Sequence, residues 1–232
     1  MPSFVLVDAL GALGQELALP AEAAHHVVRV CRSRAGDRIT ATDGRGAVAE
    51  LELLEVGREV RARIERAERQ TLSRRATLWC GAPEGERADW LIEKLVELGV
   101  TRFQPLDTER SSWRSAAART ARWQRLAAAA LRQSRQAWLM EILPARGLDE
   151  LLGQGVATDS RWLADPEGDR APVAPPGAET LGVIGPAEGL TPAERASLVT
   201  CGFLPISLAG GRLRCETAAL AWAAWWAGAR ER

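Results

Sequence analysis

The sequence predicts the α/β fold class, with a small β-rich domain over residues 1–72 and a larger domain over residues 73–232. Two observations lead to this prediction. Apolar and polar residues alternate with a period of two through much of the first part of the chain, as in half-buried strands. From residue 75 onward, short apolar runs alternate with segments of helical period, which is the pattern of parallel strands joined by helices. We therefore expect a mostly parallel sheet in the second domain.

The composition is that of an ordinary globular protein. Of the 232 residues, 47% are hydrophobic and 26% are charged, and the formal net charge of zero argues neither for nor against nucleic acid as a partner. The four cysteines form no CxxC pair, so we expect reduced thiols and no metal site. Because no apolar stretch has membrane-spanning length and the amino terminus has no signal-peptide pattern, we expect a cytoplasmic protein without a membrane partner.

The clearest element of the first domain is a hairpin. Alternating apolar residues run from residue 39 to residue 64, and the Asp-Gly-Arg-Gly sequence at residues 43–46 supplies a turn between two strands. A short apolar segment at residues 27–30 precedes the hairpin. The polar stretch at residues 70–75 is the expected domain boundary.

The second domain opens with a strand at residues 77–80 and an amphipathic helix that ends at Gly99. Four apolar side chains at helical spacing predict the buried face of this helix: Trp90, Leu91, Leu95 and Leu98. The elements that follow are a strand at 101–106, a helix at 116–134, a short helix at 148–152, and strands at 160–166, 181–184 and 203–210. A Pro/Gly-rich surface loop is expected at residues 167–179.

Two more helices can be predicted from local signals. Thr191, Pro192 and Glu194 form a capping box with proline at the first helical position, which predicts a helix that begins at this point. The last helix, from Thr217 onward, is apolar nearly all round and must be buried against the core or a partner subunit. Its tryptophans are expected to make core or dimer contacts rather than to stack on bases: Trp222, Trp225 and Trp226.

Three strand-to-loop junctions lie in the last seventy residues: 161–168, 183–190 and 207–218. In an open α/β sheet, ligands bind just beyond the carboxyl ends of the strands, so these loops predict one cofactor pocket. None of them has the glycine pattern of a phosphate-binding loop. A ligand that contacts backbone amides and small side chains fits better than a diphosphate.

Four motifs together carry a resemblance to a known family. They are "HHVVRVCRSRAGDRITATDGRG", "WLIEKLVELGVTRFQPLDTERS", "GVIGPAEGL" and "SLAGGRLRCETAAL". In this order they resemble the signatures of the bacterial 16S ribosomal RNA (uracil-N3)-methyltransferases of the SPOUT superfamily. The resemblance covers nearly the whole chain.

The resemblance implies a PUA-like β-barrel domain that helps to hold RNA, followed by a SPOUT α/β domain that dimerises and has a C-terminal trefoil knot at about residues 160–232. It also implies that the chain methylates N3 of a uridine in small-subunit ribosomal RNA, free or in the small ribosomal subunit. The cofactor would be S-adenosyl-L-methionine, bound by Leu163, Ala164, Ile184, Gly185, Pro186, Gly189, Leu208, Ala209, Leu213, Thr217 and Ala218.

The two cofactor loops depart from the family pattern. Where the family has GPEGG, this chain has Ala187 and then Glu188, so the acid is displaced by one residue. Where the family has LGxRI, Gly211 replaces the arginine and Arg212 follows it. Glu84 replaces a lysine that is usual before the first helix of the domain.

Catalysis at N3 of uridine requires removal of a proton and stabilisation of the charge that develops on the ring. Arg214 is the expected oxyanion-stabilising residue, with a structural salt bridge as the alternative interpretation. Glu188 or Glu216 is the expected proton acceptor, because no histidine follows His26. The alternative for Glu216 is that it only favours the start of the last helix.

Residues 110–135 contain seven arginines and no acid, which predicts contact with RNA phosphates. The apolar stripe of this helix is expected to be Trp123, Leu126, Ala127, Ala130 and Leu131. The arginines predicted to bind RNA here are Arg110, Arg122, Arg125, Arg132 and Arg135, together with Arg29 and Arg32 of the small domain. A solvated charged surface is the alternative for the helix. For His25 and His26, the alternative to RNA contact is a hydrogen bond to a strand backbone.

Two other functions remain open on the sequence. The loop departures are compatible with an RNA-binding or ribosome-assembly protein that has lost catalysis on the same fold. They are also compatible with a related methyltransferase that modifies another base or a ribose hydroxyl.

Overall fold

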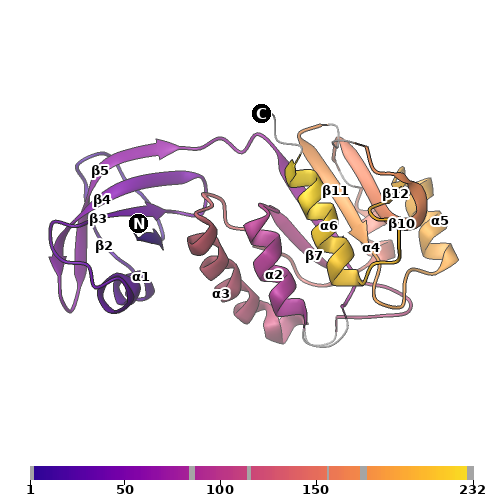
Figure 1. Cartoon of the computed structure of the whole chain (residues 1–232), viewed down its shortest axis with the longest axis horizontal. Helices are drawn as coiled ribbons and strands as arrows, with labels where there is room; N and C mark the ends of the chain where they lie inside the picture. The colour runs from indigo at the N-terminus through magenta and orange to yellow at the C-terminus, as the bar shows by residue number, and fades with distance from the viewer. Residues whose placement is uncertain (1–2, 84–86, 114–115, 156, 173–176, 229–232) are drawn as a thin grey trace. The chain divides into compact units, whose positions relative to one another are not determined.

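The computed structural model describes residues 3–83, 87–113, 116–155, 157–172 and 177–228 (Figure 1). The chain forms two compact units: residues 1–72 with 131–139, and residues 73–130 with 140–232. Glu84 and Arg114 lie outside the described residues. Among the described helices, none has the length and apolar character needed to cross a membrane.

The first unit is built on a five-stranded sheet with the order β1-β3-β4-β5-β2. Its strands are β1 (Phe4–Leu6), β2 (Glu16–Ala18), β3 (Arg38–Thr42), β4 (Ala47–Val56) and β5 (Val60–Arg69). β3 and β4 form the predicted hairpin, with Ile39 opposite Leu51 in the buried core. The Asp43 carboxylate closes its turn by accepting hydrogen bonds from the backbone amides of Arg45 (2.7 Å) and Ala47 (3.0 Å).

The segment around the two histidines forms two short helical turns rather than a strand. Helix α1 (Ala21–His25) continues directly into a π-helical turn, η1 (His26–Val30). The amide of Cys31 donates to the carbonyl of His26 at 3.0 Å, which closes the wide turn. The turn places Val27 in the core and leaves Val30 exposed.

Residues 131–139 return to the first unit and are part of its structure. The hydroxyl of Thr42 and the amide of Gly46 both donate to the carbonyl of Ala137, at 3.2 and 3.0 Å. A side chain at Gly46 would place its Cβ 2.3 Å from the Trp138 ring, so only glycine permits this contact. The predicted boundary near residue 72 does not include this segment.

The second unit holds a seven-stranded sheet in which all pairings are parallel. The strand order is β12-β10-β11-β6-β7-β8, and β9 pairs with β7. The strands are β6 (Arg75–Cys80), β7 (Arg102–Asp107), β8 (Glu141–Ile142), β9 (Arg146–Gly147), β10 (Ser160–Arg170), β11 (Glu179–Ile184) and β12 (Leu204–Ser207). The helices are α2 (Arg87–Glu97), α3 (Ala116–Ser134), α4 (Leu148–Gly153), α5 (Pro192–Thr200) and α6 (Cys215–Gly228).

Helix α6 packs on the sheet beside α2 (Figure 1). Gly182 of β11 allows this approach, because a Cβ at this position would lie 2.3 Å from the Trp222 ring. Trp222 and Trp226 are buried, which confirms that they serve packing rather than base stacking. The indole of Trp225 donates to the carbonyl of Pro172 at 2.6 Å.

Two local expectations are wrong. Trp90 is 47% exposed, because the buried face of α2 is formed by Ala88, Leu91, Ile92, Leu95 and Val96. β10 continues to Arg170, into the region predicted to be a loop, because after an irregularity its last residues pair with β12 again. Gly168 permits this second pairing, since a Cβ there would lie 2.5 Å from the amide nitrogen of Ile206.

Candidate cofactor and acceptor site

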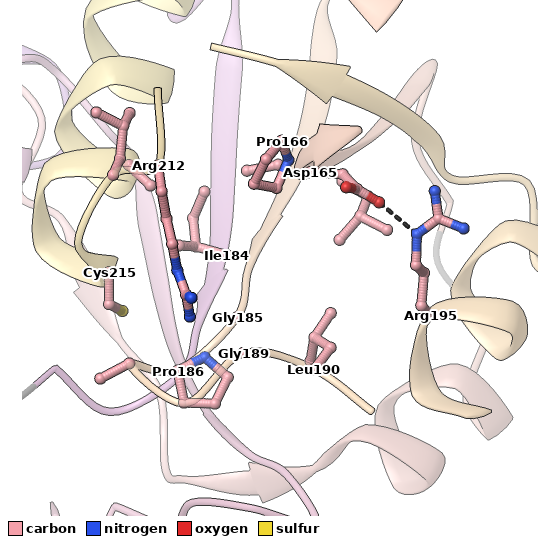
Figure 2. A pocket seen from close by; sticks show the side chains of 15 residues that line it. Asp165, Pro166, Ile184, Gly185, Pro186, Gly189, Leu190, Arg195, Arg212 and Cys215 are labelled. Atoms are coloured by element: carbon pink, nitrogen blue, oxygen red, sulfur yellow. Dashed lines mark hydrogen bonds and ion pairs between the residues drawn. The ribbon is translucent and has the colours of Figure 1, made fainter. Parts of the chain in front are cut away.

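The middle of β10, the carboxyl end of β11 and the start of α6 surround a cavity of about 330 Å³, which we call the first cavity (Figure 2). Its lining comes from the three loops that the sequence singles out. The lining residues are Leu163, Ala164, Asp165, Pro166, Ile184, Gly185, Pro186, Ala187, Gly189, Leu190, Arg195, Arg212, Leu213, Cys215 and Ala218.

The turn after β11 forms one wall of the first cavity. Gly81 supports it from β6: its amide donates to the carbonyl of Ile184 at 2.9 Å, and a Cβ at Gly81 would lie 2.4 Å from the nitrogen of Pro186. Gly189 adopts a φ of 78°, which favours glycine, and its amide donates to the carbonyl of Pro186 at 2.9 Å. Backbone and small side chains therefore approach the cavity closely.

The predicted capping box at the start of α5 is confirmed. The amide of Glu194 donates to the Thr191 hydroxyl oxygen at 3.2 Å, and the Glu194 carboxylate accepts from the Thr191 amide at 2.8 Å. The other carboxylate oxygen of Glu194 accepts from the amide of Glu109 at 2.8 Å. This buried carboxylate therefore ties the loop after β7 to the helix that begins beside the first cavity.

An ion pair lies at another side of the first cavity. The Asp165 carboxylate, only 10% exposed, accepts a hydrogen bond from Nε of Arg195 (dashed in Figure 2). This hydrogen bond raises the pKa of the Arg195 guanidinium above its ordinary value. The other oxygen of Asp165 accepts from the amide of Glu167 at 2.9 Å, which fixes the carboxylate in place.

Two buried thiols lie where β6 ends and α6 begins. Their sulfur atoms, of Cys80 and Cys215, are 3.6 Å apart, and both thiols are free. The Cys215 thiol also donates to the carbonyl of Gly81 at 3.3 Å. The hydrogen bond with Cys215 and burial raise the pKa of Cys80 well above its ordinary value. The protonated Cys80 thiol is thus a packing group at neutral pH.

A second cavity of about 280 Å³ is lined by Ala187, Arg212, Leu213, Arg214 and Glu216. The Glu216 side chain is only 7% exposed and forms an ion pair with Arg87 at the start of α2. Both cavities thus lie within the second unit.

Eight of the eleven residues predicted to bind the cofactor line the first cavity, and Leu208, Ala209 and Thr217 are not among its lining. The predicted set omits three charged residues that do line it: Asp165, Arg195 and Arg212. Arg195 follows the capping box directly, but a helix N-terminus by itself does not reveal which side chain reaches back to a neighbouring strand.

Several of the predicted RNA-binding arginines have acidic or backbone partners from other elements. Arg122 forms an ion pair with Asp89 of α2 at 2.5 Å, and Arg132 pairs with Glu22 at 2.8 Å. Arg110 donates to the carbonyls of Glu188 and Leu190 at 3.3 and 3.4 Å. The remaining arginines of the set have exposed side chains: Arg29, Arg32, Arg125 and Arg135.

The predicted apolar stripe of α3 is largely confirmed. Trp123, Ala127, Ala130 and Leu131 are buried, and Leu126 is half-buried. The indole nitrogen of Trp123 donates to the Asp89 carboxylate at 2.9 Å, so this acid contacts both the buried and the charged side of the helix.

The fold and the site together define a class of protein: a small β domain joined to a parallel α/β domain with a ligand cavity at the ends of its strands. The sequence model for the RNA methyltransferase domain matches residues 70–227, and that for the RNA methyltransferase PUA domain matches residues 19–65. The chain belongs to this RNA methyltransferase family.

Individual relatives agree with the family assignment. Ribosomal RNA small subunit methyltransferase E of Bacillus subtilis is 29% identical over 221 residues, which cover 86% of this chain and 84% of that protein. The enzyme of the same name from Synechocystis is 28% identical over 202 residues, covering 84% of this chain and 67% of that protein. The crystal structure of a ribosomal RNA small subunit methyltransferase E from Neisseria gonorrhoeae, bound to S-adenosyl methionine, is similar with a TM-score of 0.87. That structure is 28% identical and covers 97% of this chain and 96% of its own.

Proposed function

We propose that this chain binds S-adenosyl-L-methionine in the first cavity and methylates N3 of a uridine in small-subunit ribosomal RNA. The observation that supports this most directly is the meeting of the three predicted loops around one cavity, in a chain of the RNA methyltransferase family. The similar Neisseria structure, with this ligand bound, supports the same choice of cofactor.

The residues present fit such a ligand. Leu163, Ile184 and Leu213 offer apolar surface for a flat heterocycle, and the turn at Gly185 and Pro186 brings backbone close to it. The Asp165 carboxylate supplies a fixed hydrogen-bond acceptor at the cavity wall. A volume of about 330 Å³ lies in the usual range for small-molecule sites.

The methyl acceptor is proposed to occupy the second cavity. When bound, S-adenosyl-L-methionine supplies an electrophilic methyl group whose bonding electron pair returns to sulfur as the acceptor nitrogen attacks. Arg214 lines the second cavity and is the proposed donor to the charged oxygen of the uracil ring.

The two predicted acids differ in position. Glu216 lines the second cavity, but its carboxylate is held by Arg87. Glu188 is exposed and is absent from the lining of both cavities. We therefore propose that Glu216 holds the Arg87 guanidinium in place. Neither acid is proposed as the proton acceptor.

Several further features belong to this proposal. Residues 1–72 are proposed as the PUA-like domain and residues 73–232 as the SPOUT domain, with a trefoil knot at about 160–232. The chain is proposed to act in the cytoplasm on ribosomal RNA or the small ribosomal subunit, as a homodimer. The RNA contacts would come from the exposed arginines of both units, among them Arg29, Arg32 and Arg125.

Calorimetry and RNA mapping together test the proposed function. Purified chain should bind S-adenosyl-L-methionine with one site per protomer. Mass mapping of small-subunit ribosomal RNA should show one N3-methyluridine that disappears when the gene is deleted and returns on complementation. Absence of cofactor binding would favour a ribosome-assembly protein, and a methyl group lost from another base or a ribose would favour a related methyltransferase.

Arg214 can be tested by the same calorimetry and by the rate of methyl transfer to small ribosomal subunits from the deletion strain. Arg214→Gln should lower kcat by about 10² to 10³-fold, the usual effect of removing one oxyanion donor, while the affinity for the cofactor stays within about twofold. Glu188→Gln is the matched control and should leave kcat within about twofold, because its side chain lines neither cavity. An equal loss in both variants would contradict the assigned roles.

A further inference from the structure

The two cavities are neighbours. Ala187, Arg212 and Leu213 line both of them, so these three residues form a shared wall. The two cavities therefore adjoin at these residues, and groups bound in them would lie next to each other. Of the three shared residues, only Arg212 carries a charge.

Arg212 is positioned to serve both cavities. It follows Gly210 and Gly211, and a Cβ built at either glycine would have no atom within 4 Å, so the loop before Arg212 is open. Figure 2 shows the Arg212 side chain extending across the first cavity toward the turn at Gly185 and Pro186.

The second cavity has a net positive lining. Arg212 and Arg214 contribute two guanidinium groups, and Glu216 contributes the single carboxylate of the lining. The ion pair with Arg87 already balances the charge of Glu216. The Cys215 thiol, which is also at the start of α6, lines the first cavity but not the second. An anionic acceptor would therefore be favoured in the second cavity.

We infer that Arg212 is a second cationic contact of the methyl acceptor, and that with Arg214 it binds a uracil imide in its N3-deprotonated form. This inference rests on the proposed function. The proton leaves N3 for solvent water, and its electron pair stays on the ring, shared between N3 and the two carbonyl oxygens. The pair on N3 then forms the new N–C bond. Two planar guanidinium groups that donate to the carbonyl oxygens stabilise this charge without a general base.

The obvious alternative is that Arg212 binds the amino-acid carboxylate of the cofactor instead. Binding calorimetry separates the two roles without any turnover, because 5′-methylthioadenosine lacks that carboxylate and S-adenosylhomocysteine retains it. We expect Arg212→Gln to bind both compounds within about twofold of the wild type. Arg75→Gln is the matched control, because it removes an exposed arginine from the start of β6, at the other end of the same sheet.

The pH dependence of kcat tests the acceptor contact, because kcat reports groups that titrate in the enzyme–substrate complex. The substrate is small ribosomal subunits from the deletion strain. For the wild type we expect kcat to rise with pH and then level off. Arg212→Gln should lower kcat by about 10² to 10³-fold near neutral pH and move the levelling-off to higher pH. Arg212→Lys should recover part of the loss, and Arg75→Gln should behave as the wild type.

Two results would overturn the inference. One is a tenfold or greater loss of affinity for S-adenosylhomocysteine in Arg212→Gln with unchanged affinity for 5′-methylthioadenosine, which would assign the arginine to the cofactor. The other is a pH profile of Arg212→Gln with the midpoint of the wild type. A wild-type chain that methylates no uridine N3 would remove the proposed function and this inference together, whereas either result above removes the inference alone.

Discussion

At single positions, the absence of a side chain sets how closely elements approach one another. Gly182 lets α6 lie on β11, and Gly81 lets the end of β6 support the turn at Pro186. Both contacts involve rigid groups, an indole ring and a proline backbone, that have no room to yield. Close packing of this kind is costly to disturb, because interiors have little free volume.

Gly182→Ala should therefore destabilise the chain by about 1–3 kcal/mol, because the new methyl group overlaps the Trp222 ring. Urea unfolding followed by tryptophan fluorescence measures the change. Gly153→Ala is the control, since Gly153 is exposed at the end of α4 and no atom lies within 4 Å of its added Cβ. Equal stability of the two variants would contradict the packing argument.

The raised pKa of Cys80 predicts a pH dependence of stability. In the unfolded chain this thiol ionises near its ordinary pKa of about 8.5, whereas in the folded chain it stays protonated to higher pH. The unfolded state then binds fewer protons than the folded state, so the free energy of unfolding falls as pH rises above about 8.5. Cys80→Ala should reduce this slope in urea unfolding repeated across this pH range.

Among the elements, α3 shows how charge in one segment depends on its neighbours. Its sequence contains no acid, yet Arg122 meets Asp89 of α2. An ion pair of this kind cannot be read from the spacing along one helix, because the partner lies 33 residues away (122 − 89) in the sequence. The exposed Arg125 is then the better candidate for a phosphate contact.

Arg125→Gln should flatten the dependence of log Kd on log salt for ribosomal RNA by about one unit. Arg122→Gln should change the slope less, because its charge already interacts with Asp89. Fluorescence anisotropy over a range of KCl concentrations measures both slopes. A wild-type slope in Arg125→Gln would identify this part of α3 as an ordinary solvated surface.

Elements with strong local signals could be predicted from the sequence, and those that depend on distant partners could not. The capping box at Thr191 and Glu194 satisfies its own backbone groups, so it has the same form in any context. The extension of β10 depends on its pairing with β12, which local composition does not reveal. Trp90 is exposed because the buried face of α2 is formed by smaller side chains, among them Leu91 and Leu95. The hydrophobicity of Trp90 alone does not reveal which face of the helix is buried.

For the molecule as a whole, the site was predicted at the level of loops more than of residues. The parallel pairing places Leu163 of β10 opposite Val183, near the end of β11, which is why Leu163, Ile184 and Gly185 meet as expected. The positions of long charged side chains could not be predicted in the same way, because their length lets them reach the first cavity from residues beyond the strand ends. Arg195 and Arg212 are the two that sequence spacing left out.

The proposed homodimer can be tested on α6. Its outer face carries small or half-buried residues: Thr217, Leu220, Ala221 and Ala224. Ala224→Arg should convert a dimer into a monomer in sedimentation equilibrium, because a long charged side chain prevents close approach. Ala117→Arg, at an exposed position of α3, is the control and should remain dimeric. A monomeric wild-type chain would contradict the proposal.

The return of residues 131–139 to the first unit has a consequence for the order of synthesis. The amide of Gly46 obtains its hydrogen-bond acceptor, the carbonyl of Ala137, only after β6 and β7 of the second unit have emerged from the translating ribosome. The amino-terminal unit therefore cannot complete these contacts until residues 131–139 have been synthesised. A fragment that stops at residue 72 would expose to water the surface at Gly46 on which Trp138 packs. A stable fragment of the first unit therefore has to include residues 131–139 as well.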